Sequence, residues 1–237
     1  MFYKKTIVPY KLKWRDIQYF FQQNSFLELY EDNEFLDEIL NDTADVFIDV
    51  GANIGRISSL VAAYNHWYKK IIALEPNTNC IQIWLKYIPN KIKKRIDFKD
   101  YGLWDKTDTC KMTIHSTHVT TTRWTLHEEK SPLQNRESKD KQKINVKILS
   151  FNDFFEENKL YEYKTFIMKI DVEWYEEYVL KSFFEFINKN NWKYIFKVII
   201  EILDCNYDLF EKLEQFWIDK KNIKQLWTSD DYLFQIK

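Results

Sequence analysis

The sequence predicts an α/β fold in which helices cover both faces of a parallel sheet. Short apolar runs that are typical of buried strands alternate with segments whose apolar residues recur at helical spacing. The opening unit, Val46–Gly55, passes from such a strand into a loop that holds two of the three glycines in the chain, and helical spacing begins after it. A strand, a glycine loop and a helix in this order direct backbone N–H groups toward a ligand. We therefore expect a binding site here, with glycine needed because the chain turns tightly and a Cβ atom would block close approach of that ligand.

The remaining elements follow from their own patterns. Helical spacing between Trp14 and Leu40 predicts two short helices, so residues 1–43 are interpreted as an N-terminal helical cap. Residues 105–149 alternate like half-buried strands around a polar middle, which predicts a β-rich, hairpin-type insertion. No repeat or low-complexity tract is present, so one domain is expected over residues 1–237. The other expected elements are strand 70–74, helix 80–88, strand 96–99, insertion strands 111–114 and 145–148, strand 165–170, helix 178–187, strand 198–200, helix 209–219, and closing strands near 223–227 and 232–236.

Composition narrows the class of protein. The 237 residues carry a net charge of −1, and acids and bases are interspersed, so the basic footprint of a nucleic-acid-binding protein is missing. Cys80, Cys110 and Cys205 lack the spacing of a metal or redox motif, which suits a reducing compartment. The basic segment Met1–Arg15 lacks the apolar core of a signal peptide, and no run reaches the ~20 apolar residues of a membrane span. We expect a soluble, cytoplasmic protein.

Acidic residues follow the predicted strands. Because ligands bind at the carboxyl edge of an open α/β sheet, these residues mark the expected site. Glu75 lies roughly 20 residues beyond the glycine loop, where an acid can bind both hydroxyls of a ribose. It can also be read as a capping carboxylate before Pro76 and the next helix; because loop and acid occur together, the binding interpretation is preferred. The five acids are Asp49, Glu75, Asp100, Asp171 and Glu201.

Two other classes of nucleotide-binding protein also use a glycine-rich loop after a strand. A nicotinamide dehydrogenase would need the third glycine of the dinucleotide fingerprint, but the loop has only Gly51 and Gly55, and no proton-relay Tyr-x-x-x-Lys follows on a helix. The Gly-Lys-Ser/Thr loop of a phosphate-binding NTPase is absent as well.

Four motifs in order resemble the FkbM family of S-adenosylmethionine-dependent methyltransferases. They are Phe47–Gly55, Ala73–Asn77, Met168–Glu173 and Ile199–Ile202. Each motif is weak alone, but their order and spacing together are specific, and the resemblance covers about residues 46–203. It implies a class I methyltransferase fold with a Rossmann-like seven-stranded sheet whose last strand is antiparallel. The family mostly methylates hydroxyl groups, often on sugars or natural products.

The resemblance also implies which residues contact the cofactor. The segment from Asp49 to Gly55 would hold the methionine part, Glu75 the ribose hydroxyls, and Asp171 would face the transferred methyl group. The cofactor-binding residues expected on this basis are Asp49, Gly51, Ala52, Asn53, Gly55, Glu75, Pro76, Asp100, Tyr101, Gly102, Leu103 and Asp171, with Asp100–Leu103 lining the adenine.

Methyl transfer to a hydroxyl requires alignment of donor and acceptor and removal of a proton. Asp171 is the first candidate base, and His115 and His118 of the insertion are the alternatives, although a lone histidine in a polar loop is often simply solvated. Glu173 and Glu201 are candidates to orient Asp171 or to hold a metal, but because no His-rich ligand set is present, no metal is predicted. The hydroxyl run Ser116, Thr117, Thr120, Thr121 and Thr122 can hydrogen-bond a polyhydroxylated acceptor or merely fill a β-rich loop.

One departure from the family bears on the acceptor. Trp174 stands where the family usually has glycine after Asp-Val-Glu, and its ring either narrows the pocket, supports a sugar face, or is a packing substitution. The expected partner is a small-molecule or glycan acceptor, with no nucleic acid; the sequence does not predict an oligomeric state. Two alternatives stay open: a nucleic-acid methyltransferase, which the missing Asn-Pro-Pro-Tyr-type motif disfavours, and a catalytically silent cofactor-binding relative that acts as an interaction module.

Overall fold

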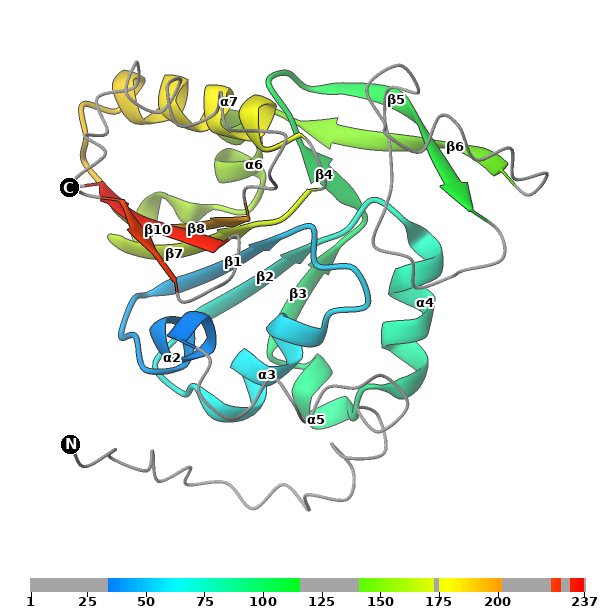
Figure 1. Ribbon diagram of the computed structural model, residues 1–237, viewed down its shortest axis with the longest axis horizontal. Helices are drawn as coiled ribbons and strands as arrows, with labels where there is room; N and C mark the ends of the chain where they lie inside the picture. The colour runs from blue at the N-terminus through cyan, green and yellow to red at the C-terminus, as the bar shows by residue number, and fades with distance from the viewer. Residues whose placement is uncertain (1–33, 116–140, 173–174, 202–222, 227–230, 237) are drawn as a thin grey trace.

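The computed structural model describes residues 34–115, 141–172, 175–201, 223–226 and 231–236 (Figure 1). The elements are α2 (Glu34–Leu40), β1 (Val46–Val50), α3 (Arg56–Tyr64), β2 (Lys70–Leu74), α4 (Thr78–Tyr87), α5 (Asn90–Lys93), β3 (Ile96–Lys99), β4 (Tyr101–Leu103), β5 (Asp108–His115), β6 (Lys141–Leu149), α6 (Phe151–Glu157), the 3₁₀ helix η4 (Leu160–Glu162), β7 (Thr165–Ile170), α7 (Glu176–Lys189), β8 (Ile195–Glu201), β9 (Lys224–Gln225) and β10 (Asp231–Ile236).

The main sheet has seven strands in the order β3-β2-β1-β7-β8-β10-β9. Strands β3, β2, β1, β7 and β8 are parallel to one another, and β10 runs antiparallel to both β8 and β9. The chain moves outward from β1 to β2 and β3, and then returns to the other side of β1 as β7. This confirms the predicted α/β class with an antiparallel last strand. It also places a topological switch point at the carboxyl ends of β1 and β7.

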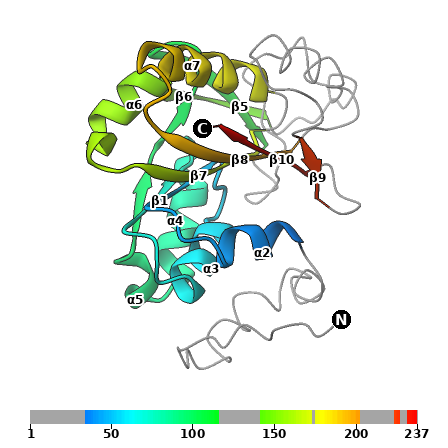
Figure 2. The same cartoon turned by 90° about the vertical axis from the view of Figure 1, so that its left-hand side faces the viewer.

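A hydrophobic core lies on each face of the sheet because both faces of a parallel sheet are covered by helices (Figures 1 and 2). One core joins the sheet to α6 and α7, and includes Ile48, Met168 and Phe183. The other joins the opposite face to α2, α3, α4 and α5, and includes Phe47 and Ile167. The β1 side chains are buried along the whole strand, which explains why it is apolar apart from one aspartate.

Helix α6 is an element that the sequence reading missed. Ser150 caps it by accepting a hydrogen bond from the Asp153 N–H at 3.2 Å. Phe151, Phe154 and Phe155 are fully buried against α7 and the sheet. The Ser-x-x-Asp capping pattern followed by apolar residues at i, i+3 and i+4 was a usable signal for this helix.

A second sheet of three strands, in the order β4-β6-β5, extends beyond the main sheet. Strands β5 and β6 are antiparallel, as the predicted hairpin requires, and His115 pairs with Lys141 in their Cα register. The short strand β4, which was not predicted, pairs parallel with β6 and joins this sheet to the end of β3. Figure 1 shows the second sheet past the carboxyl ends of the central strands, so it is placed to wall a site there.

Several predicted features lie outside the described residues. They include most of the N-terminal cap, the tip of the insertion and the helix at 209–219. The single-domain assignment over residues 1–237 therefore stays a prediction. In the part of the chain that is described, no helix is long and apolar enough to cross a membrane.

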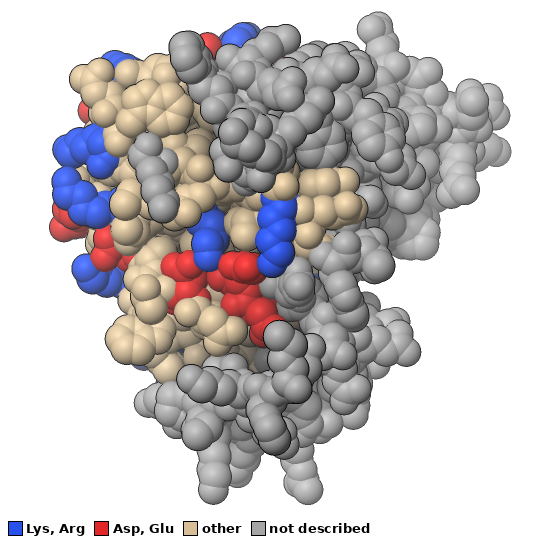
Figure 3. Space-filling view, turned by 60° about the vertical axis from the view of Figure 1, so that its left-hand side comes forward, with Lys and Arg blue, Asp and Glu red and all other residues tan. Residues whose placement is uncertain are grey.

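Helix α2 is tied to the sheet by ion pairs. The Lys197 Nζ on β8 lies 3.0 Å from Glu38 Oε2 and 2.7 Å from Asp42 Oδ2, and the Lys224 Nζ lies 3.5 Å from Glu38 Oε1. Figure 3 shows acidic side chains beside basic ones on this side of the molecule. The mixed signs among the described residues agree with the near-zero net charge of the chain.

Candidate active site

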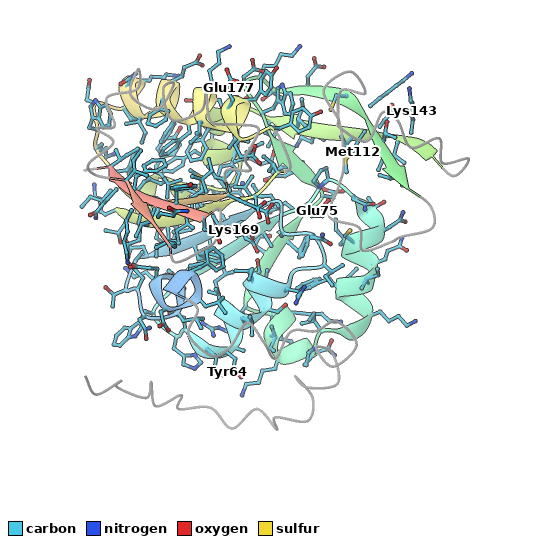
Figure 4. All side chains as sticks on the ribbon, viewed as in Figure 1. Tyr64, Glu75, Met112, Lys143, Lys169 and Glu177 are labelled. Carbon is cyan, nitrogen blue, oxygen red and sulfur yellow. The ribbon has the colours of Figure 1, made fainter. Side chains whose placement is uncertain are left out.

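Strand register brings the polar residues together at the carboxyl edge of the sheet. Asp49 on β1 pairs with Lys169 on β7 and with Ala73 on β2. Because side chains alternate between the two faces of a strand, residues two positions further along share the same face. Gly51, Glu75 and Asp171 occupy those positions at the strand ends. Figure 4 shows Glu75 and Lys169 near the middle of the molecule, with Met112 on the second sheet.

A pocket opens at this edge between the two sheets. Its empty volume is about 740 Å³, including the part open to solvent. The polar wall comes from the ends of the central strands, and the opposite wall is apolar and comes largely from the second sheet. The polar lining residues are Asn53, Glu75 and Asp171, and the apolar ones include Leu103, Trp104, Met112, Val146, Ile148 and Tyr175.

The two loop glycines are required by the protein's own packing. Gly51 has φ +79, and a Cβ atom there would lie 1.9 Å from the backbone oxygen of Asp171. Gly55 has φ +68, and its Cβ would lie 2.5 Å from Cδ1 of Trp84. Both φ values are positive, as the predicted tight turn requires, and the further expectation that glycine makes room for a ligand stays a prediction. The nearest obstacles are a neighbouring strand end and a helix side chain.

Glu75 is buried beneath the glycine loop. Its Oε2 accepts a hydrogen bond from the Asn53 N–H at 2.9 Å, and its Oε1 accepts one from the Asn77 N–H at 2.8 Å. Burial raises the pKa of this carboxyl from 4.5 to about 7, although the two N–H donors and the Lys169 ammonium pull the pKa down. The carboxylate thus fixes both the loop and the start of α4. Because each oxygen has a second lone pair, it can also accept from a ligand in the pocket.

Asp171 and Lys169 form an ion pair at the edge of the pocket. Asp171 lines the pocket, its side chain is 33% exposed, and its Oδ2 lies 3.1 Å from the Lys169 Nζ. Lys169 is 7% exposed. Burial lowers the pKa of Lys169, but the Asp171 and Asp49 carboxylates raise it by more, so the net shift is upward. Lys169 is therefore a charged ammonium at neutral pH.

Asp49 is fully buried and does not line the pocket. Its Oδ2 accepts hydrogen bonds from the Ser58 hydroxyl at 2.6 Å and the Ser58 N–H at 3.2 Å, and its Oδ1 lies 3.3 Å from the Lys169 Nζ. In the described structure this carboxylate binds α3 and Lys169. Direct contact between Asp49 and a cofactor stays a prediction.

The other predicted site residues fall into two groups. Pro76, Gly102 and Leu103 line the pocket with Gly51, Asn53, Glu75 and Asp171. Ala52, Gly55, Asp100 and Tyr101 do not line it. Asp100 is exposed, and the Tyr101 hydroxyl is buried and accepts a hydrogen bond from Asn158 Nδ2 at 2.8 Å.

The alternative catalytic residues are placed only in part. His115 is the last residue of β5, and Glu201 is the last residue of β8. His118, Glu173 and Trp174 lie outside the described residues. Within the described ranges, no three or more His, Cys, Asp and Glu side chains gather to hold a metal ion.

Sequence reasoning missed Lys169, Trp104 and Tyr175. A lysine within the apolar run Phe166–Ile170 was a usable signal, because an unpaired charge in a buried strand is costly. Trp104 packs against Tyr178 with ring centroids 4.5 Å apart and against Tyr175 at 4.9 Å. No spacing in the sequence links these aromatic residues to a pocket.

Comparison with solved structures gives matches of low identity. A precorrin-6y C5,15-methyltransferase from Geobacter metallireducens is 10% identical, with 89% of this chain and 90% of that chain covered and a TM-score of 0.41. An rRNA methylase from Streptococcus thermophilus is 10% identical, with 86% and 92% covered and a TM-score of 0.39. An RNA methyltransferase from Salinibacter ruber, in complex with S-adenosyl-L-homocysteine, is 11% identical, with 86% and 90% covered and a TM-score of 0.38. No curated protein matches the chain.

The family assignment depends on the sequence. The family model described as the Methyltransferase FkbM domain matches residues 49–223. This range holds the glycine loop, Glu75, Lys169 and Asp171, and it takes in most of the chain. The chain therefore belongs to the FkbM methyltransferase family.

Proposed function

We propose that this chain is an O-methyltransferase that uses S-adenosylmethionine to methylate a hydroxyl of a sugar, a glycan or a related small molecule. The observation that carries the proposal is the pocket between the two sheets. One wall presents the Glu75 and Asp171 carboxylates beside the glycine loop, and the other is apolar.

The chemistry of these walls fits the cofactor. Glu75 offers acceptor lone pairs for the two ribose hydroxyls, and the segment from Gly51 to Asn53 would lie along the methionine part. An adenine ring would lie among Pro76, Leu103 and Ile148. Gly102 suits this placement, because the nearest atoms to a Cβ built on it are 3.7 Å away, on Ile148 and Pro76.

When bound, S-adenosylmethionine supplies a methyl group on a cationic sulfur; the acceptor oxygen forms the new bond to carbon, and the carbon–sulfur electron pair returns to sulfur. The chain's own contribution is alignment and removal of the hydroxyl proton. Asp171 is the candidate to accept this proton, because it lines the pocket on the polar side. His115, at the end of β5, and His118, which lies outside the described residues, stay as alternatives.

Cofactor binding is the first test of the proposal. Calorimetry with S-adenosylmethionine and S-adenosylhomocysteine should give saturable heats. Glu75→Ala should weaken binding by about 1–3 kcal/mol, the usual loss when a hydrogen bond to a charged group is removed. Glu38→Ala is the matched control, because this glutamate pairs with Lys197 and Lys224 away from the pocket lining. Folded wild-type chain that gives no heat with either ligand would refute the proposal.

The acceptor class needs a second measurement. Methyl transfer should be assayed on free sugars, nucleotide-linked sugars and RNA oligonucleotides of matched concentration. Transfer to a sugar hydroxyl is the expected result. Transfer to RNA alone would show that the acceptor is a nucleic acid. Cofactor binding without transfer to any acceptor would favour a catalytically silent, cofactor-binding relative.

The pKa of Glu75 predicts how cofactor affinity changes with pH. The carboxylate form of Glu75 should bind the ribose hydroxyls. The fraction of Glu75 in this form should fall as pH decreases through about 7. Affinity should therefore be about tenfold weaker at pH 6 than at pH 8, as for any single group that must be ionised to bind. Calorimetry at both pH values on wild type and Glu75→Gln measures the effect. An equal pH dependence in the two proteins would assign it to another group.

The raised pKa of Glu75 also makes the free energy of unfolding depend on pH. Because the pKa of Glu75 is higher in the folded chain than in the unfolded chain, the folded chain binds this proton more tightly. The contribution of this group to stability is thus largest below pH 4.5 and decreases as pH rises toward about 7. Cofactor binding above that pH has to offset the cost of the buried charge.

A further inference from the structure

A single buried ammonium contacts three oxygens at the carboxyl edge of the sheet, two of them on residues that line the pocket. The Lys169 Nζ lies 3.1 Å from Asp171 Oδ2, 3.3 Å from Asp49 Oδ1 and 3.4 Å from the Gly51 backbone oxygen, to which it donates a hydrogen bond. These oxygens belong to the end of β7, to β1 and to the glycine loop. Lys169 itself is outside the pocket lining, so it reaches the pocket only through these partners.

The need for a cation at this position follows from the charges around it. Asp49 and Asp171 would repel each other without the ammonium between them, and Asp49 is fully buried. A buried carboxylate that loses its partner is strongly destabilised. Asp171 has more freedom because its side chain is 33% exposed, and among the described residues Lys169 is its only side-chain partner. Asp171 is therefore the partner whose position depends most on Lys169.

We propose that Lys169 is a positioning residue that holds the Asp171 carboxylate in the arrangement used for methyl transfer. The inference rests on the proposed function and deepens it. Lys169 engages Oδ2 of Asp171 and leaves Oδ1 to meet the acceptor hydroxyl. Its net upward pKa shift keeps it protonated, so it does not serve as the base.

A double-mutant cycle on turnover tests this role. Lys169→Met should lower kcat about 100-fold, the size of effect that a displacement near 1 Å produces, with little change in the KM for the cofactor. In an Asp171→Asn background the same substitution should cost less than about threefold, because its target is already removed. Equal losses in both backgrounds would overturn the proposal. Lys197→Met is the matched control, since Lys197 lies on the same sheet as Lys169 and also bridges two carboxylates. The kcat of this variant should equal that of wild type.

A second cycle uses the unliganded chain and thermal unfolding. Lys169→Met should lower the unfolding midpoint by roughly 10 °C, because Asp49 is left buried without its cation. Asp49→Asn added to Lys169→Met should recover at least half of that loss. If Lys169→Met does not fold, the turnover cycle is repeated in the Asp49→Asn background. A chain that fails to fold there as well overturns the proposal, because Lys169 is then needed for the fold even when Asp49 carries no charge.

The two cycles separate this inference from the proposed function. Wild-type chain that binds no S-adenosylmethionine refutes the proposed function, whereas the unfolding cycle still measures the coupling between Lys169 and its carboxylates. Wild-type chain that is active but shows additive losses refutes the positioning role alone.

Discussion

Asp171→Asn should reduce turnover by about 10²–10⁴-fold while leaving cofactor affinity nearly unchanged. Asparagine keeps the shape of the side chain and one oxygen acceptor, but it cannot take the proton of an acceptor hydroxyl. Asp171 lies at the carboxyl end of β7, in the pocket wall that also contains Glu75, and the proposed role depends on this position. Single-turnover methyl transfer at saturating cofactor, with calorimetry on the same preparations, measures both quantities.

Two sets of variants separate proton transfer from other causes. Asp45→Asn breaks the ion pair between Asp45 Oδ1 and Lys69 Nζ, which are 2.6 Å apart, at the amino end of β1. It should leave turnover unchanged, and so it controls for loss of an ion pair away from the pocket. His115→Ala and His118→Ala should each cost far less than Asp171→Asn. Full activity in Asp171→Asn, together with loss in a histidine variant, would move the base to the insertion.

Much of the main sheet could be predicted because its central strands are buried on both faces. Such strands read as continuous apolar runs, and the residues of β1 and β2 are almost all buried. The glycine loop and the acids at the strand ends then fix which edge carries the site. Strand β4 and helix α6 were missed for different reasons. The three residues of β4 are too few to show a period, whereas the capping signal of α6 was present and was overlooked.

The contacts within the site could be predicted less well than its location. Glu75 reaches the Asn53 N–H across 22 positions of sequence, and Lys169 reaches Asp49 across strands that are far apart in the chain. The register between paired strands decides such contacts, and this register depends on which strands are neighbours in the sheet. Asp49 shows the consequence. The sequence placed it correctly at a strand end, but the structure directs its carboxylate toward Ser58 and Lys169, away from the pocket.

Gly51 in the glycine loop is a further residue whose location could be predicted better than its contacts. It also gives the second large expected effect. Gly51→Ala should destabilise the fold by about 3 kcal/mol or more, because an alanine at positive φ is strained and its Cβ overlaps a backbone oxygen. That Cβ would lie 1.9 Å from the Asp171 oxygen, far inside van der Waals contact. For a chain of this size the loss corresponds to an unfolding midpoint lowered by roughly 10 °C.

The surrounding backbone has little freedom to relieve this overlap. The Gly51 and Ala52 N–H groups donate to the Leu74 oxygen at 3.1 and 2.9 Å, and the Asp171 N–H donates to the Val50 oxygen at 3.1 Å. Both sides of the contact are thus bonded into the sheet. Gly102→Ala is the matched control for folding, because its Cβ would find no atom closer than 3.7 Å, and its unfolding midpoint should match that of wild type. Thermal unfolding of both variants without ligand makes the comparison. A Gly51→Ala midpoint equal to that of Gly102→Ala would show that the loop can move away from β7, and it would refute the requirement for glycine in packing.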